Sequence, residues 1–205
     1  MENRLLAINK RILALAHSGL HYGNSPFDLE RYQELEQLGY EMMGILADMP
    51  TEKVIRLFVT RDAYATPMVD VRAVVVKDEQ LLLVQEKTDG KWSLPGGWAD
   101  VGYSASEVAV KEVKEEAGLT VKAVRLLAVF DKAKHPHPPE MYYVYKMFML
   151  CEALDDTLET GLETSGVGFF SLDELPPLSL NRVLPSQIEH IYQLIQEPKP
   201  GAAFD

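Results

Sequence analysis

A glycine-rich loop that runs into a short acidic helix, residues 97–119, is the most constraining feature of this sequence. At about 100° per residue, Glu112, Glu115 and Glu116 fall on one face of a helix, within about a third of its circumference. Like charges at this spacing repel one another and weaken the helix. A divalent cation removes the conflict, because hard cations such as Mg²⁺ take oxygen ligands. The pattern therefore predicts a metal-binding face on this helix.

The same helix carries its own start and stop signals. Ser104 and Glu107 have the spacing of a capping box, which predicts that the helix begins just after Ser104. Gly118 stands where a residue in the left-handed conformation commonly ends a helix. The face opposite the glutamates is apolar, so we expect it to pack on a sheet. Its residues are Val110, Val113 and Ala117.

This segment resembles the signature of the Nudix hydrolases. The positions that match in register are Gly97, Glu112, Val113, Glu115, Glu116, Gly118 and Leu119. Two positions differ, because Tyr103 replaces the first glutamate of the signature and Lys111 replaces its arginine. Lys111 supplies the positive charge of that arginine but not its planar fork.

Further segments extend the resemblance over nearly the whole chain. The helical N-terminal part, residues 69–74, residues 85–103 and Phe130-Asp-Lys132 are similar to a bacterial subgroup of Nudix enzymes, in which Tyr103 is part of the pattern. Members are similar to CDP-choline pyrophosphatases, and related sequences to ADP-ribose pyrophosphatases. The resemblance implies a homodimer in which the helical segment takes part.

The implied reaction is hydrolysis of a nucleoside diphosphate linked to another group, X. CDP-choline is the leading substrate, giving CMP and phosphocholine; ADP-ribose and RNA ends are the alternatives. The resemblance implies that Mg²⁺ or Mn²⁺ is held by Glu112, Glu115, Glu116 and the carbonyl of Gly97. The general base stays open between Glu163, Glu115 and Glu116, and a plain surface position for Glu163 is an equal alternative.

Three further side chains are candidates for substrate binding. The guanidinium of Arg72 matches phosphate oxygens in a bidentate manner, although a position at the rim of a strand is an equal alternative. Trp98 and Tyr103 are candidates for offering a ring face to a nucleobase, although aromatic residues belong more often to the core.

Composition limits the classes of protein that this chain can represent. The formal net charge of −11 argues against a general nucleic-acid surface, since phosphate binding depends on clustered Lys and Arg. The single cysteine, Cys151, excludes an internal disulfide framework, suits a reducing compartment and is expected to be buried. No apolar run is long enough to span a bilayer, so we expect a soluble, cytoplasmic protein.

The pattern along the chain predicts two parts. Residues 1–50 are expected to form two amphipathic helices, with breaks at Ser18-Gly19 and again at 22–26, that serve docking or dimerisation. Residues 66–205 are expected to form the Nudix hydrolase domain. Strands are expected at 69–76, 80–85, 121–130, 141–150 and 167–171, and a last helix at 184–196. The predicted fold class is α/β: a Nudix-type α/β/α sandwich with a mixed β-sheet, preceded by a helical segment.

Two functions outside the enzyme class remain as alternatives. A nucleotide-binding sensor would use the same fold without turnover, but the presence of all three signature glutamates argues against it. A scaffold that dimerises through residues 1–50 would show no dependence on metal.

Overall fold

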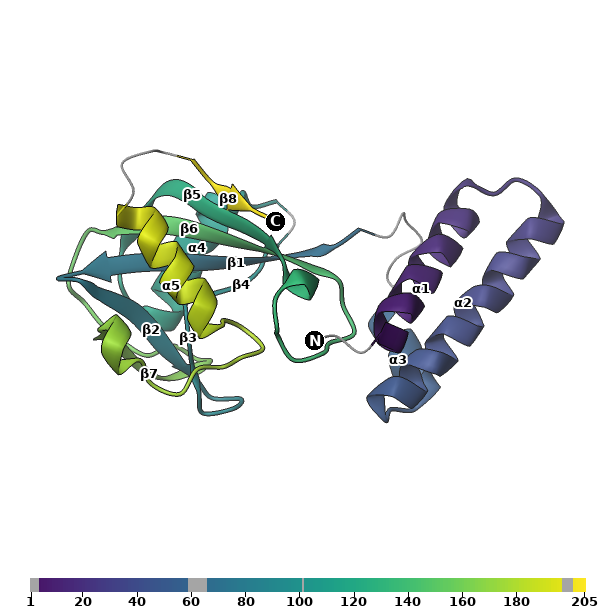
Figure 1. Cartoon of the computed structure of the whole chain (residues 1–205), viewed down its shortest axis with the longest axis horizontal. Coiled ribbons are helices and arrows are strands. Elements are labelled where there is room, and N and C mark those ends of the chain that lie inside the picture. Colours follow the sequence, from purple (N-terminus) through teal and green to yellow (C-terminus); the bar gives the residue numbers. More distant parts are fainter. Residues whose placement is uncertain (1–3, 59–65, 101, 197–200) are drawn as a thin grey trace. The chain divides into compact units, whose positions relative to one another are not determined.

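The computed structural model describes residues 4–58, 66–100, 102–196 and 201–205. They divide into two compact units (Figure 1). The helical unit contains the chain up to Pro67 together with Pro138–Tyr143, and the sheet unit contains Met68–His137 and Val144–Asp205.

The helical unit is an antiparallel pair of long helices followed by a short one. Its elements are α1 (Arg4–Tyr22), α2 (Pro26–Ala47) and α3 (Thr51–Phe58). Helix α2 begins with Pro26 after an extended Ser25, because a proline at the first helical position loses no hydrogen bond. The short helix α3 was not predicted from the sequence.

The predicted break at Ser18-Gly19 is wrong, because α1 continues to Tyr22. The hydroxyl of Ser18 donates to the carbonyl of Ala14 at 2.8 Å, so this residue stays within the helical hydrogen-bond pattern. Gly19 serves close packing: a Cβ there would lie 2.5 Å from the ring of Tyr32 on α2. A glycine that looks like a helix breaker therefore lets two helices approach.

The sheet unit is built on a mixed sheet, which confirms the predicted fold class. Its described strands are β1 (Met68–Lys77), β2 (Gln80–Glu86), β3 (Trp92–Ser93), β4 (Gly96–Trp98), β5 (Val121–Asp131), β6 (Val144–Ala153), β7 (Thr164–Phe170) and β8 (Ala203–Phe204). The strand order is β3-β2-β1-β6-β5-β8, with β4 paired to β1 and β7 to β2. β1 runs parallel to β6 and antiparallel to β2 and β4, so both senses of pairing meet at β1.

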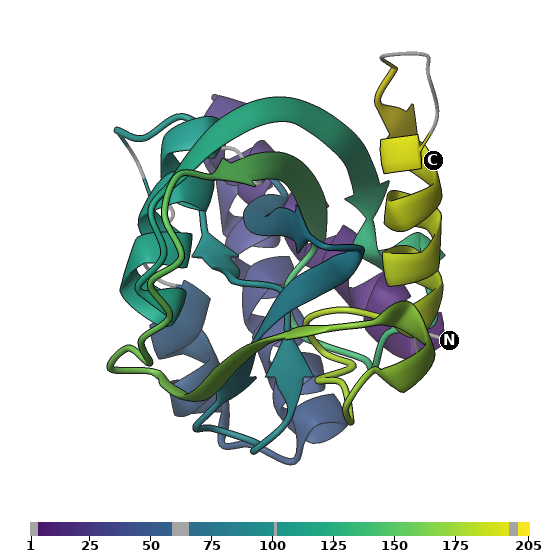
Figure 2. The ribbon, with the colours of Figure 1, turned by 90° about the vertical axis from the view of Figure 1, so that its left-hand side faces the viewer.

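Two helices cover opposite faces of this sheet (Figures 1 and 2). Helix α4 (Ala105–Ala117) packs on the face that carries Val71, and α5 (Pro185–Gln196) on the face that carries Val74. Cys151 is buried in the core beneath α4, as expected. The arrangement is the predicted sandwich of helix, sheet and helix.

The strand predicted at 141–150 begins later than expected, at Val144. Met141 instead packs against the core of the helical unit, and the carbonyl of Tyr142 accepts a hydrogen bond from Lys10 Nζ at 2.7 Å. Among the described residues, no helix has the length and apolar character that crossing a membrane requires.

Candidate active site

The loop and helix that dominate the sequence are formed as predicted. The N–H of Ser104 donates to the carboxylate of Glu107 at 2.8 Å, and the N–H of Glu107 donates to Ser104 Oγ at 3.3 Å, which completes the capping box. Gly118 ends α4 with a positive φ of 70°, and its N–H donates to the carbonyl of Lys114 at 3.2 Å. Both ends of the acidic helix are therefore fixed by local hydrogen bonds.

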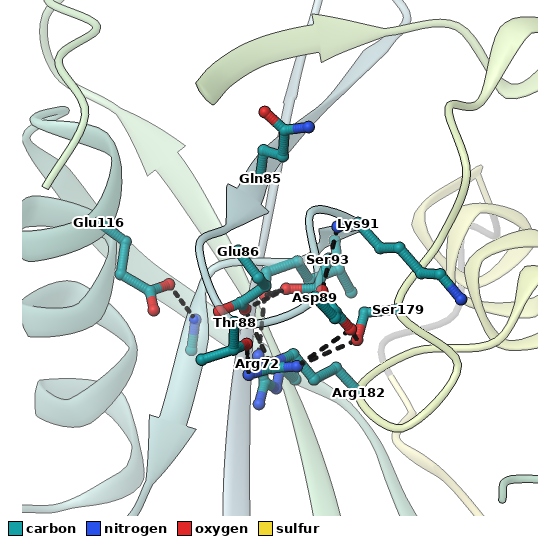
Figure 3. Close-up of polar contacts among 12 residues, drawn as sticks. Arg72, Gln85, Glu86, Thr88, Asp89, Lys91, Ser93, Glu116, Ser179 and Arg182 are labelled. Atoms are coloured by element: carbon teal, nitrogen blue, oxygen red, sulfur yellow. Dashed lines mark hydrogen bonds and ion pairs between the residues drawn. The ribbon is translucent and has the colours of Figure 1, made fainter. Parts of the chain in front are cut away.

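Glu116 is the most deeply buried of the three signature glutamates. Only 6% of the residue is exposed, and its Oε2 accepts a hydrogen bond from the N–H of Gly96 at 2.9 Å (Figure 3). Burial raises the pKa of Glu116 to about 7; the Gly96 N–H and the charge of Arg72 oppose the rise, and Glu86 and Glu112 add to it. The carboxylate is thus placed where ionisation is unfavourable without a further positive charge.

Glu112 lies beside the backbone of the glycine loop. A Cβ on Gly97 would be 3.3 Å from Glu112 Oε2, so the carboxylate touches the main chain at this glycine. Burial is the main cause of the raised pKa of Glu112; the charge of Lys111 opposes it. Two carboxylates from successive turns of α4 therefore face the turn that precedes the helix.

Glu115 is more exposed than Glu112 and Glu116. Its side chain is 58% exposed, and its carboxylate is 3.2 Å from Lys111 Nζ. Lys111 Nζ also lies 3.6 Å from Glu112 and 3.7 Å from Asp100, so this lysine sits among three carboxylates. The sequence predicted that the three glutamates share one metal-binding face of α4 and that Val110 packs on the sheet. In the structure α4 is turned, so that Glu116 is buried and Val110 is only partly buried.

The donors at this turn are suited to a hard cation. The carboxylates of Glu112 and Glu116 and the backbone of Gly97 supply oxygen, the ligand type that Mg²⁺ and Mn²⁺ take in proteins. Among the described residues, no three His, Cys, Asp or Glu side chains lie close enough together to hold a metal ion. Glu115 would have to leave Lys111 to join the other two carboxylates.

The other predicted site residues lie in different surroundings. Arg72 is buried rather than at a rim, and donates from Nε to Asp70 at 2.9 Å and from Nη1 to the carbonyl of Leu94 at 3.1 Å. Trp98 and Tyr103 are 44% and 51% exposed, so neither belongs to the core.

Glu163 is exposed on the loop before β7, and this loop lies against the last turn of α4. Thr164 Oγ1 donates to the carbonyl of Glu116 at 2.8 Å, and a Cβ on Gly161 would lie 1.9 Å from the carbonyl oxygen of Glu115. The backbone of the loop is therefore fixed to the acidic helix, although its exposed glutamate makes no described contact with the signature carboxylates.

Comparison with known proteins agrees with this geometry. Residues 66–191 match the NUDIX domain, which is more than half of the chain. The chain belongs to the Nudix hydrolase family. Residues 3–58 match a second family, described as a UDP-X-like, N-terminal oligomerisation domain.

Similar proteins with named activities narrow the range of reactions considered within the family. A Bacillus subtilis (strain 168) protein with the provisional name ADP-ribose pyrophosphatase YjhB is 42% identical over 205 residues, which cover 100% of this chain and 99% of the relative. The crystal structure of a UDP-X diphosphatase is 37% identical, covers 98% of each chain and has a TM-score of 0.65. The crystal structure of a Streptococcus suis 89-1591 ADP-ribose pyrophosphatase is 44% identical, covers 68% of this chain and 100% of that one, and has a TM-score of 0.63. The chain is therefore a Nudix pyrophosphatase, an enzyme of a family that generally needs divalent metal ions.

Sequence reasoning missed several buried charges beside the Nudix carboxylates. Lys146 is fully buried on β6 and donates from Nζ to Asp70 on β1, its neighbour in the parallel register. Glu86 is buried at the end of β2, within 2.9 Å of Arg182. A signal was present in the sequence, because Asp70 and Lys146 lie within strands of mostly apolar residues and Glu86 ends another such strand.

Proposed function

We propose that this Nudix enzyme hydrolyses the diphosphate bond of a nucleoside diphosphate linked to X, with CDP-choline as the leading substrate. One observation carries the proposal: the buried carboxylate of Glu116 and the partly buried carboxylate of Glu112 lie against the backbone of Gly96 and Gly97. Two carboxylates held against the same stretch of backbone favour the binding of a divalent cation, and a bound divalent cation in turn binds the diphosphate of the substrate.

The reaction is a transfer of one phosphoryl group to water. A water oxygen forms a bond to one phosphorus, the bridging P–O bond breaks, and the bridging oxygen leaves with the other phosphate. A divalent ion, when bound, neutralises the charge that develops on the phosphoryl oxygens and lowers the pKa of coordinated water. Glu112, Glu116 and the Gly97 carbonyl are the groups that would hold it, with Glu115 as a further ligand.

The proton of the attacking water needs a carboxylate as acceptor. Glu163 and Glu115 are the candidates, because both carboxylates are exposed and therefore accessible to a water molecule. Glu115 lies 3.2 Å from Lys111, which holds it on the same side of α4 as Glu112. Glu163 lies on the loop that is hydrogen-bonded to the end of α4 through Thr164.

We propose that three side chains bind the substrate. Arg72 is oriented by Asp70 and lies within electrostatic reach of Glu112 and Glu116, next to the position expected for the diphosphate. Trp98 follows Gly97 directly and is partly exposed, as is Tyr103, so both are available to a nucleobase.

Two conjugates compete as the substrate. The sequence resemblance in residues 69–132 supports CDP-choline. The names of the relatives support ADP-ribose as a second candidate, since both the Bacillus subtilis and the Streptococcus suis proteins bear that substrate in their names.

A panel of substrates separates these possibilities. It contains CDP-choline, ADP-ribose, a UDP conjugate and a short RNA with a 5′-triphosphate, each with Mg²⁺, Mn²⁺ or a chelator, with products resolved by chromatography. Release of CMP and phosphocholine supports the leading proposal, and release of AMP and ribose 5-phosphate supports the second. Hydrolysis that persists in chelator, or no hydrolysis by the folded protein, contradicts both.

We further propose that the helical unit makes the enzyme a homodimer. Its helices expose large apolar side chains, among them Leu5, Phe27, Leu38 and Ile45. Large apolar side chains exposed on a surface often belong to interfaces, and the match of residues 3–58 to an oligomerisation domain agrees with that use.

A further inference from the structure

The segment that leads into β7, residues 159–164, closes the C-terminal end of helix α4. The last carbonyl groups of a helix have no hydrogen-bond partner within the helix. The N–H of Glu159 donates to the carbonyl of Ala117 at 2.9 Å. Thr164 Oγ1 donates to the carbonyl of Glu116 at 2.8 Å. This segment, which we call the β7 loop, therefore supplies hydrogen bonds that the end of the acidic helix needs.

A glycine lets the β7 loop come close to the helix. A Cβ on Gly161 would lie 1.9 Å from the carbonyl oxygen of Glu115 and 3.2 Å from the Cα of Glu116, so a side chain there would force the backbone to shift. The N–H of Gly161 donates to Thr164 Oγ1 at 2.8 Å, which ties the two ends of the turn around Glu163 together. Glu163 is thus flanked along the chain by two residues that lie against the backbone of the signature glutamates.

Lys87 holds the β7 loop through three successive carbonyl groups. It follows β2 directly, and its backbone N–H donates to the carbonyl of Glu163 at 2.9 Å. Its ammonium group donates to the carbonyl of Leu162 at 2.8 Å and to that of Gly161 at 3.3 Å. Hydrogen bonds from a charged donor are stronger than those between neutral groups. One residue therefore fixes the backbone on which Glu163 stands.

A β-bulge follows the β7 loop directly. The register of β7 on β2 shifts between Gln85 and Glu86, which leaves Ser165 as an extra residue. Ser165 Oγ donates to the carbonyl of Gln85 at 3.3 Å. Bulges re-aim the side chains of the bulged strand and are frequent beside active sites. Next to this bulge, Thr164 is buried and Glu163 is exposed.

These contacts distinguish Glu163 from a glutamate on a free surface loop. Its backbone is held by Lys87 and, through its neighbours, by the end of α4. A general base has to stand within hydrogen-bond reach of the proton that it removes, and a displacement of about 1 Å can cost about 100-fold in rate. A fixed backbone limits the positions that an exposed carboxylate can reach.

We propose that Lys87 is a positioning residue, which holds the backbone of residues 161–163 so that Glu163 presents its carboxylate to the attacking water. Glu163 then accepts the proton that the water loses as its oxygen bonds to phosphorus. Lys87 has no need to touch metal or substrate in this role. The effect on turnover rests on the proposed function, whereas the effect on the loop does not.

The test compares Lys87→Met, Lys87→Arg, Glu163→Gln and the double variant Lys87→Met/Glu163→Gln with wild type. Lys114→Met is the matched control, because Lys114 also donates from Nζ to a carbonyl at the end of α4, that of Gly118 at 2.7 Å, which lies outside the β7 loop. For each protein, kcat and KM are measured on the best substrate of the panel, and Mn²⁺ affinity with the metal alone. Hydrogen exchange of the amides of residue 87 and Gly161, followed by nuclear magnetic resonance, reports the loop without any turnover.

Lys87→Met is expected to speed both amide exchanges and to lower kcat by about 10-fold, with KM and Mn²⁺ affinity within about threefold of wild type, because only the base is displaced. Lys87→Arg keeps charged N–H donors and should stay within about threefold of wild type in kcat. Glu163→Gln removes the base and should lower kcat by at least about 100-fold. Adding Lys87→Met to it should cause no further loss, because Lys87 acts only through Glu163. Lys114→Met should leave kcat and both exchange rates unchanged.

Three results would overturn the proposal. The first is an equal kcat for Lys87→Met and the control, and the second is unchanged exchange of both amides in Lys87→Met. The third is a further loss of kcat when Lys87→Met is added to Glu163→Gln, since a merely structural role of Lys87 would lower kcat in that background as well. A folded wild type that hydrolyses nothing would refute the proposed function, while the exchange rates would still decide whether Lys87 holds the loop.

Discussion

Replacing Glu116 with glutamine should stabilise the metal-free protein while it removes activity. Burial raises the pKa of this carboxyl from 4.5 to about 7. The difference corresponds to about 3 kcal/mol by which the folded state disfavours the ionised form relative to the unfolded chain. Glutamine has nearly the same shape, keeps an oxygen for the Gly96 N–H, and has no charge to bury. The buried acid thus costs stability that a bound cation would return.

The sign of the pH dependence follows from the raised pKa. Between pH 4.5 and about 7 the folded state binds more protons than the unfolded one, so wild-type stability falls as pH rises through this range. Glutamine does not titrate. The stability difference between Glu116→Gln and wild type should therefore be smallest below pH 4.5 and should approach about 3 kcal/mol in favour of the variant above pH 7.

Urea denaturation in chelator, at about pH 5 and about pH 8, measures this difference. Glu115→Gln is the control, because Glu115 is 58% exposed and should give little change at either pH. Added Mn²⁺ should then stabilise wild type and not Glu116→Gln. Equal stability of wild type and Glu116→Gln at both pH values would refute the reasoning.

Three further changes test other parts of the structure. Gly96→Ala should destabilise by at least about 2 kcal/mol in urea denaturation, because its φ is 148° and a Cβ would lie 2.0 Å from the carbonyl oxygen of Val71; Gly90→Ala, with open space around it, should cost only about 1 kcal/mol. Ser104→Ala should cost about 1 kcal/mol in the same assay through loss of the helix cap, and no change would show that the capping box is unimportant. Ile45→Glu, at a site 81% exposed on α2, should halve the molecular mass measured by light scattering if the helical unit dimerises. The control Leu154→Glu, on the sheet unit, should leave the mass unchanged. An unchanged mass for Ile45→Glu would show that the face of α2 that carries Ile45 is not the dimer interface.

The loop and helix of the site were predictable because their signals are local. The capping box of Ser104 and Glu107 and the left-handed Gly118 each depend on residues within one or two turns. The turn between β1 and β2 is equally local, since Asp78 and Glu79 both adopt positive φ there. In such segments, sequence and structure agree to within a few residues.

Features that depend on distant partners were not predictable in this way. Gly19 does not break α1, because its role is set by Tyr32 on the facing helix. The depth of Glu116 depends on how α4 is turned on the sheet, and helical spacing alone places three glutamates on one face without saying which is buried. The pairing of Asp70 with Lys146 requires the parallel register of β1 and β6, which links residues far apart in the sequence.

The most direct test of the account is the rate of nucleotide release from CDP-choline and ADP-ribose with Mn²⁺, for wild type and Glu116→Gln side by side. The account predicts turnover by wild type and a loss of at least about 100-fold in the variant, with the variant folded and no less stable. A variant that keeps wild-type turnover on either substrate would show that the buried carboxylate of Glu116 is not part of the catalytic site.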